Sequence, residues 1–126
     1  MKASPKLITS LSKNEIFVFG SNKEGYHIGG AAKIAHESFG AEWGIGIGHT
    51  GKCYAIPTMS GIEEIEKSVS EFIEYAKNNQ YLIFLVTEIG CGIAGYTPQQ
   101  IAPLFKNISE NVLLPKIFTN ILTQKL

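Results

Sequence analysis

Between Leu82 and Tyr96 the chain changes from a long apolar run to a glycine-rich loop. The run Leu82–Ile89 is almost continuously apolar and is bounded by glycine, which predicts a strand buried on both faces of a sheet. The loop Gly90–Tyr96 has glycines at 90, 92 and 95, so its backbone can adopt positive φ and approach another group closely. Thr97 and Pro98 follow as the expected N-cap and first residue of a helix. Strand, glycine loop and helix N-terminus together predict an anion site, usually for phosphate. One or two glycines would equally suit a plain tight turn, but three glycines before a capped helix favour the anion site.

The rest of the chain alternates between strand and helix patterns. We expect further strands at 16–19, 53–56 and 111–114, and helices at 31–39, from 98 to about 109 with a kink or restart at Pro103, and after Pro115. The clearest helix carries an apolar stripe from Ile62 to Ala76, with Ser60 and Glu63 as a capping box. Residues 43–51 are expected to form a glycine-rich loop. This alternation predicts one α/β domain over residues 1–126, a sandwich with helices on both faces of a mixed sheet.

Composition narrows the possible functions. The chain has 126 residues, 44% of them hydrophobic and 17% charged, which indicates a globular protein. Eleven lysines balance eleven glutamates, and arginine and aspartate are absent, so no bulk charge favours binding to DNA or RNA. Any phosphate would have to be held by backbone N–H groups, lysine or hydroxyls. No segment is apolar enough to predict a membrane span or a signal peptide. Cys53 and Cys91 therefore indicate reduced thiols in a cytoplasmic protein, and the spacing of cysteines and histidines predicts no metal.

Two segments fit the glycine pattern of dinucleotide-binding loops. The segment Gly46–Gly51 has no strand before it and leads into one, which is the wrong context for that fingerprint. The segment Gly90–Gly95 does follow a strand, but too little sequence remains after it for the rest of a dinucleotide-binding sheet. A hydride-transferring dehydrogenase is therefore not expected, and no cofactor is predicted.

Several side chains near these loops are candidates for chemistry. Glu88 ends a buried strand, where a carboxylate must be paired or face a cleft, and it is the preferred general acid or base. Cys91 precedes a helix N-terminus, which would stabilise a thiolate, with His27 or His49 as its base; a small packing residue is the favoured interpretation. Tyr96 could stack on a ligand ring or pack in the core.

The sequence allows two roles each for Asn22 and Trp43, and one role for His36. Asn22 could close an Asx-turn or contact a ligand. Trp43 could line a pocket or cover the end of the sheet, and His36 is expected on the solvated surface.

Three segments together resemble the macrodomain superfamily, especially the small macrodomain-like proteins of bacteria and their phages. They are Phe17–Asn22, Gly29–Ile34 and Gly90–Pro98, with Tyr54–Thr58 at the position of the family's middle strand. The resemblance covers roughly residues 16 to 105. It implies a three-layer α/β/α sandwich that binds ADP-ribose or a related nucleotide, a small-molecule partner. Asn22 would face the distal ribose, and the loops at Gly29 and Gly92 would hold the diphosphate. The implied ligand-binding residues are Ser21, Asn22, Gly29, Gly30, Ala31, Gly90, Cys91, Gly92, Ile93, Ala94, Gly95 and Tyr96.

The chain departs from that family at two positions. The adenine-contacting Asp cannot be present, and Ala32 stands where the hydrolytic branch carries an Asp. These departures favour a binding protein over that branch's hydrolysis. Two alternatives stay open: a hydrolase of an ADP-ribosyl bond or an ADP-ribose-derived nucleotide that uses Glu88, Asn22 or Cys91, and a protein-interaction module that has lost the ligand. The oligomeric state is not predicted.

Overall fold

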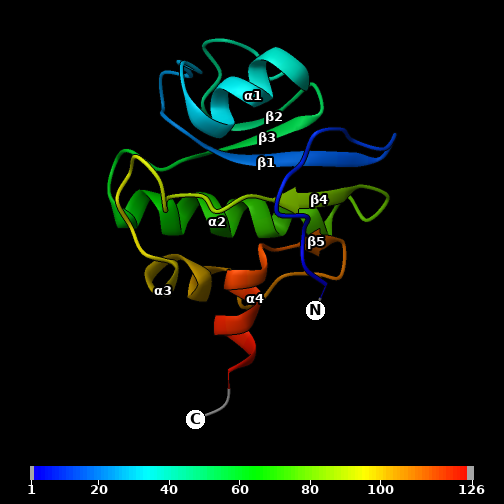
Figure 1. Cartoon of the computed structure of the whole chain (residues 1–126), viewed down its shortest axis with the longest axis vertical. Coiled ribbons are helices and arrows are strands. Elements are labelled where there is room, and N and C mark those ends of the chain that lie inside the picture. Colours follow the sequence, from blue (N-terminus) through cyan, green and yellow to red (C-terminus); the bar gives the residue numbers. More distant parts are fainter. Residues whose placement is uncertain (1, 125–126) are drawn as a thin grey trace.

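A computed structural model of the chain describes residues 2–124. A five-stranded mixed sheet has the strand order β2-β3-β1-β4-β5, in which only β2 runs antiparallel to its neighbour. The strands are β1 (Glu15–Ser21), β2 (Gly48–Thr50), β3 (Cys53–Pro57), β4 (Ile83–Val86) and β5 (Val112–Leu113). The helices are α1 (Gly30–Ser38), α2 (Ile62–Lys77), α3 (Pro98–Ile101) and α4 (Lys116–Thr123), with a 3₁₀ helix η1 (Ala102–Phe105) after α3. In Figure 1, α1 lies at one end of the molecule and α3 and α4 at the other, with the strands between them.

Alternation along the parallel strands divides the core into two parts. On β1, Ile16 and Val18 pack in a large core with α2, η1 and α4, while Phe17 and Phe19 pack in a smaller core with α1. Successive side chains of a strand point to opposite faces, so each buried strand must be apolar throughout. The structure confirms the predicted α/β fold, a mixed sheet with helices on both of its faces.

Strand β4 is shorter than the sequence predicts. It ends at Val86, and residues 87–89 already belong to the following loop. Its position between β1 and β5 and the burial of Phe84, Leu85 and Val86 confirm that it is an interior strand buried on both faces. The N-terminal segment adds to this region, because the hydroxyl of Ser4 donates a hydrogen bond to the Val86 carbonyl over 2.8 Å.

The predicted capping box of α2 is wrong. Gly61 is the N-cap, with φ of 95°, and no side chain caps the first turn, so Ser60 and Glu63 do not pair as expected. The apolar stripe is confirmed, since Ile65, Val69, Phe72, Ile73 and Ala76 are buried, although Ile62 is only partly buried. Glu63, Glu66 and Lys67 are exposed as expected, but Glu64 is half-buried.

Two other local predictions need correction. The loop 43–51 contains strand β2, which pairs with β3 through His49 and Tyr54. The helix expected from 98 to about 109 stops at Phe105 and changes to 3₁₀ form at Ala102, next to Pro103. Proline lacks an N–H and crowds the preceding turn, so the change at this point has a direct cause.

The loops that follow β1, β3 and β4 leave the sheet on the same side (Figure 1). Parallel strands bring their carboxyl ends to one edge, so these loops meet although they are far apart in sequence. In the region 2–124, no helix is both long enough and apolar enough to cross a membrane.

Candidate functional site

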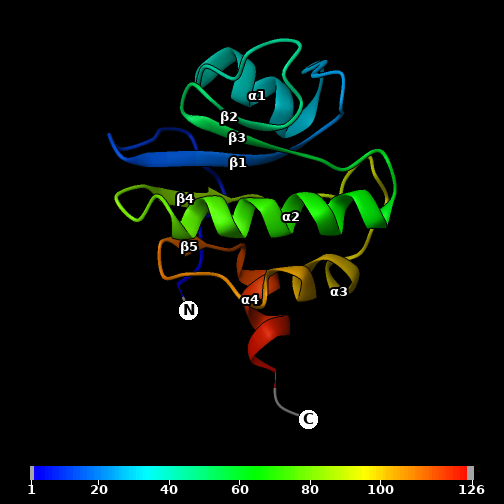
Figure 2. The same cartoon turned by 180° about the vertical axis from the view of Figure 1, so that it is seen from behind.

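A cleft of about 510 Å³ lies at the carboxyl ends of β1, β3 and β4. It is formed by residues from the β1–α1 loop with the start of α1, from the β3–α2 loop and from the β4–α3 loop; the last two loops are seen from behind in Figure 2. Its lining residues are Gly20, Ser21, Asn22, Tyr26, Ile28, Gly29, Gly30, Ala31, Ala32, Thr58, Met59, Thr87, Glu88, Ile89, Gly90, Gly92, Ile93 and Ala94. The expected convergence of Asn22, the Gly29–Gly30 turn and the loop after β4 is therefore found.

The glycines of the cleft have two different roles. A Cβ added to Gly29, Gly30 or Gly92 would meet no atom within 4 Å, so at these three positions glycine leaves open space. Gly90 has φ of +75°, and a Cβ there would lie 3.1 Å from the Ile101 Cδ1 atom, so this position needs glycine for the fold. Of the three loop glycines that could adopt positive φ, Gly90 and Gly95 do so and Gly92 does not.

Two runs of backbone N–H groups at the cleft have no acceptor. The amides of Gly29, Gly30, Ala31 and Ala32, at the N-terminus of α1, donate no hydrogen bond to any atom of residues 2–124. The same holds for the amides of Gly90, Gly92, Ile93 and Ala94 in the β4–α3 loop. Because the first four N–H groups of a helix have no intrahelical acceptor and the helix dipole is positive there, the first run favours an anion.

The helix N-terminus in the cleft is that of α1, which follows the Gly29–Gly30 turn, and not that of α3, which the strand–loop–helix pattern indicated. Thr97 and Pro98 begin α3 as expected. In the capping box there, the Thr97 amide donates to Gln100 Oε1 and the Gln100 amide donates to the Thr97 hydroxyl oxygen. However, α3 has only four residues, and neither Thr97 nor Pro98 lines the cleft. The glycine-rich β4–α3 loop instead faces the start of α1, so the predicted combination of loop and helix N-terminus comes from two distant segments.

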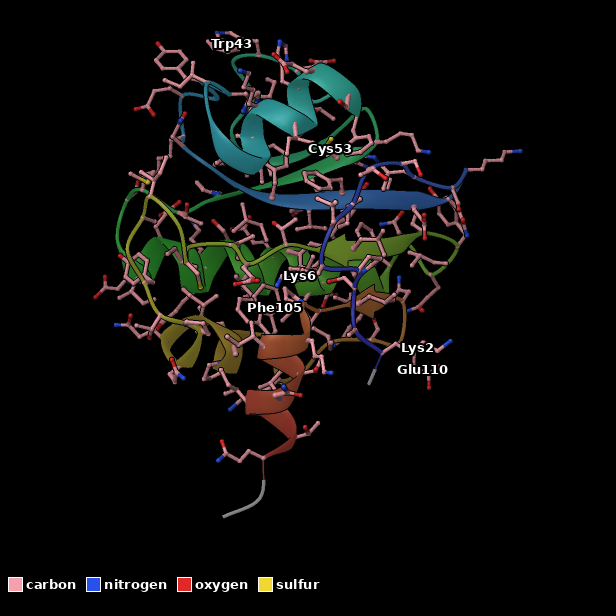
Figure 3. All side chains as sticks on the ribbon, viewed as in Figure 1. Lys2, Lys6, Trp43, Cys53, Phe105 and Glu110 are labelled. Atoms are coloured by element: carbon pink, nitrogen blue, oxygen red, sulfur yellow. The ribbon has the colours of Figure 1, made fainter. Side chains whose placement is uncertain are left out.

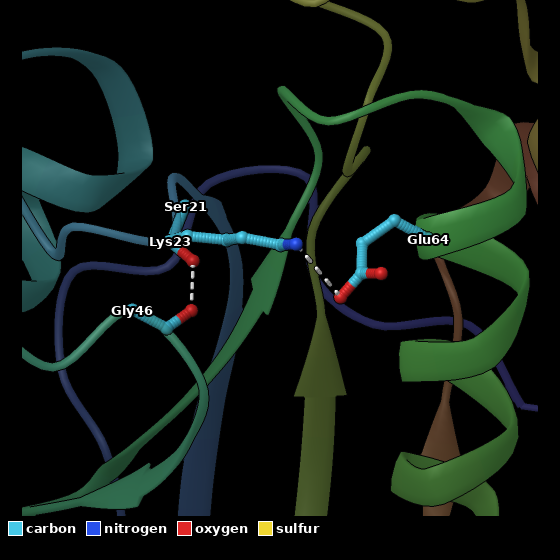
Figure 4. Close-up of polar contacts among 4 residues, drawn as sticks. All are labelled: Ser21, Lys23, Gly46 and Glu64. Atoms are coloured by element: carbon cyan, nitrogen blue, oxygen red, sulfur yellow. Dashed lines mark hydrogen bonds and ion pairs between the residues drawn. The ribbon is translucent and has the colours of Figure 1, made fainter.

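Most polar side chains that line the cleft are already bonded to the backbone. The Ser21 hydroxyl donates to the Gly46 carbonyl, a contact drawn in Figure 4. The Thr87 hydroxyl donates to the Val18 carbonyl over 2.8 Å, and the Thr58 hydroxyl donates to the Ser21 carbonyl over 3.4 Å. These hydroxyls hold the strand ends in place and have no second hydrogen to donate to a ligand.

Asn22 closes a wider turn than the Asx-turn considered from the sequence, because its side chain bonds Tyr26, four residues further along the chain. Its Oδ1 accepts from the Tyr26 amide over 2.9 Å, and its Nδ2 donates to the Tyr26 carbonyl over 3.0 Å. An amide group has two donor hydrogens and two acceptor lone pairs, so one of each stays free at the cleft.

Glu88 follows β4 and is exposed. It lines the cleft, and a carboxylate at this strand end was expected either to be paired or to face a cleft. It makes no hydrogen bond or ion pair through its side chain within residues 2–124. Its carboxylate is therefore free to accept a hydrogen bond, or to take a proton, in the cleft.

Three predicted site residues lie outside the cleft lining: Cys91, Gly95 and Tyr96. Cys91 and Tyr96 are partly buried against the large core. Burial, with a smaller contribution from the Glu88 charge, raises the pKa of the Cys91 thiol to about 11, which argues against the alternative of a stabilised thiolate and agrees with the favoured interpretation, a small packing residue. Gly95 instead shapes the loop, with φ of +84° and an amide that donates to the Gly92 carbonyl.

The histidines suggested as bases for Cys91 have other partners. The Nε2 atom of His27, which is buried, lies 2.8 Å from the Glu42 carbonyl oxygen. The Nδ1 atom of His49 lies 2.6 Å from the Tyr75 hydroxyl, and its Nε2 lies 3.0 Å from the Gly51 carbonyl oxygen. Neither ring has Cys91 as a partner, and no cysteine–histidine pair is formed.

Trp43 covers an aromatic cluster next to α1 and does not line the cleft (Figure 3). Its ring stacks on Tyr26 with centroids 5.9 Å apart and meets the edge of His36 at 5.5 Å. His36 is exposed as predicted, but its Nδ1 atom also contacts the Ala41 carbonyl oxygen at 2.7 Å. This cluster supports the loop that carries Tyr26 into the cleft.

The loop after β1 is also tied to α2. Lys23, which follows Asn22, forms an ion pair with Glu64 at 3.7 Å (Figure 4). Through this contact the half-buried Glu64, in the first turn of α2, connects that helix to the loop after β1.

Several lining residues are not among the predicted site residues, for example Tyr26, Ile28, Thr58 and Met59. Thr58 and Met59 directly follow β3, so the rule that parallel strands share a carboxyl edge would have found them. Tyr26 and Ile28 lie in the sequence between Asn22 and Gly29, two predicted site residues, and this position could have identified them as lining residues.

A second cavity of about 470 Å³ involves Lys2 and Glu110, far from Trp43 in Figure 3, and contains none of the predicted site residues. Across residues 2–124, no group of three or more metal-binding side chains comes together. Comparison of the chain with protein-family models, with curated proteins and with solved structures found no match.

Proposed function

We propose that this protein binds ADP-ribose or a related nucleotide in the cleft at the carboxyl ends of β1, β3 and β4, and that its fold is macrodomain-like. The observation that carries the proposal is the two sets of amides at the cleft, those of residues 29–32 and those of Gly90, Gly92, Ile93 and Ala94, which have no acceptor within residues 2–124. The two runs come from the same segments that resemble the macrodomain diphosphate loops.

Energetics favour a phosphate group at these amides even without an arginine or lysine in the lining. A hydrogen bond to a charged group contributes about 1.5–3 kcal/mol net. The repulsion between a phosphate and the exposed Glu88 carboxylate is about 1 kcal/mol at 4 Å in water-like surroundings. Two or three amide contacts therefore outweigh this repulsion. The open space at Gly29, Gly30 and Gly92 lets a diphosphate approach the backbone.

The direct test is calorimetric titration of ADP-ribose into the parent protein and into Gly92→Val. A valine side chain would occupy the space above the loop amides, so we expect affinity to fall roughly tenfold or more, where each tenfold step is about 1.4 kcal/mol. Because Gly92 has no positive φ and its Cβ would meet no atom, the variant should melt at the parent temperature.

Ser70→Val is the matched control, since it adds the same branched side chain at an exposed position of α2 outside the cleft. It should bind like the parent. Undiminished binding by folded Gly92→Val would move the phosphate site elsewhere. No binding of any nucleotide by the parent would favour the interaction module.

The free carboxylate of Glu88 in the cleft favours a second candidate, hydrolysis of an ADP-ribosyl bond with Glu88 as general acid or base. In that case Glu88→Gln would still bind ADP-ribose but would lose turnover of an ADP-ribosylated protein. If no product forms with the parent protein, the binding function stands alone.

A further inference from the structure

Four large apolar side chains are exposed together around the cleft. The exposed fractions are 53% for Tyr26, 76% for Ile28, 53% for Met59 and 86% for Ile93, and all four residues line the cleft. We call this set the apolar rim. Its members come from three different loops, so chain neighbourhood alone does not explain why they gather. Exposed apolar groups that gather beside polar groups are typical of ligand sites.

The apolar rim and the free amides belong to one cleft. Its volume of about 510 Å³ lies in the range of small-molecule sites, roughly 300–1,000 Å³. A ligand that fills it needs an anionic part for the amides and a flat or apolar part for the rim. A nucleoside diphosphate has both parts in adjacent positions.

The cleft has few side-chain groups with which to distinguish one base from another. The hydroxyls of Ser21, Thr58 and Thr87 donate to backbone carbonyls, and the Asn22 amide uses one of its donors and one of its acceptors on the Tyr26 backbone. Selecting one base requires uncommitted donors and acceptors at its edge, as bidentate amide and guanidinium contacts provide. Apolar and stacking contacts accept every base, because each base has a π-face.

We propose that the cleft binds nucleoside diphosphates without selecting the base: the amides hold the phosphates and the apolar rim covers the base. This inference rests on the proposed nucleotide-binding function and specifies its ligand class. Within residues 2–124 the Glu88 carboxylate and the Tyr26 hydroxyl make no hydrogen bond or ion pair, and Asn22 keeps one donor and one acceptor, so base selection would have to come from these three side chains.

The test is calorimetric titration of ADP, GDP, CDP and UDP into the parent protein. We expect the four dissociation constants to agree within roughly tenfold, because stacking tolerates every base. A preference above about tenfold for one base would overturn the inference, since it needs a specific edge contact. That result would leave the proposed function intact, whereas absence of binding by all four and by ADP-ribose would remove both.

Two variants sharpen the test. Ile93→Ser should weaken all four nucleotides by a similar factor, while the matched control Leu7→Ser, at an apolar position that is 78% exposed and outside the cleft, should change none. Glu88→Gln removes a negative charge near the phosphates, so all four should bind more tightly at low salt and in an unchanged order. A changed order in Glu88→Gln, or an effect of Ile93→Ser on one nucleotide alone, would contradict a base-independent rim.

Discussion

The thiol of Cys91 shows how burial decides the chemistry of a single residue. Its position in a glycine loop before a helix suggested a thiolate, yet the side chain packs against the large core. Burial raises its pKa from 9.0 to about 11, and the nearby Glu88 charge acts in the same direction. The neutral thiol is therefore the form present near pH 7.

This raised pKa predicts slow alkylation of Cys91 by iodoacetamide at pH 7.5, with a rate that rises about tenfold per pH unit until the pH approaches 11. The folded state retains the thiol proton longer than the unfolded state does, so the group stabilises the fold below pH 9, and this stabilisation is lost as the pH rises through about 11. Mass spectrometry of the labelled peptides measures the rate, with Cys91→Ser, in which only the buried Cys53 can react, as the control. Fast labelling at pH 7.5 would instead indicate an activated cysteine.

Among the elements, helix α2 contributes most of the aromatic packing in the large core. The Phe72 ring centroid lies 5.0 Å from that of Tyr54, 5.4 Å from that of Phe84 and 6.4 Å from that of Phe105. Phe72 thus joins α2 to β3, β4 and η1, the elements that carry the loops of the cleft or continue from them.

Phe72→Ala should lower the free energy of unfolding by about 3–5 kcal/mol, because it removes a fully buried ring and leaves a cavity. Lys67→Ala, on the exposed side of the same helix, should stay within about 0.5 kcal/mol of the parent. Denaturant unfolding followed by circular dichroism measures both. Similar stabilities for the two variants would show that the α2 face is not packed as described.

Element existence was predictable where periodicity was strong, and element ends were not. The α2 stripe and the apolar β1, β3 and β4 strands follow from burial on one or two faces. The start of α2 depends on the positive φ of Gly61, for which the sequence has no side-chain pattern. The capping box predicted from Ser60 and Glu63 was therefore wrong. Strand β2 has three residues and is defined only by its pairing with β3, so no local pattern could reveal it.

For the whole molecule, it was predictable that distant loops would meet, but not which of their side chains would face the cleft. Parallel strands share a carboxyl edge, so Asn22, Gly29 and Gly92 were expected to meet. Which side chains face the cleft depends on packing: Cys91 and Tyr96 turn to the core, while Thr58 and Met59 turn to the cleft. Sequence spacing does not determine these orientations.

The measurement that tests the backbone-amide site most directly is a ¹H–¹⁵N NMR titration of the parent protein with ADP-ribose. We expect the largest amide shifts at residues 29–32 and at Gly90, Gly92, Ile93 and Ala94, the amides without acceptors. The amides of β2 and of the second half of α2, which do not line the cleft, should hardly move. Largest shifts outside the two amide runs, or no shifts at millimolar ligand, would contradict the backbone-amide site.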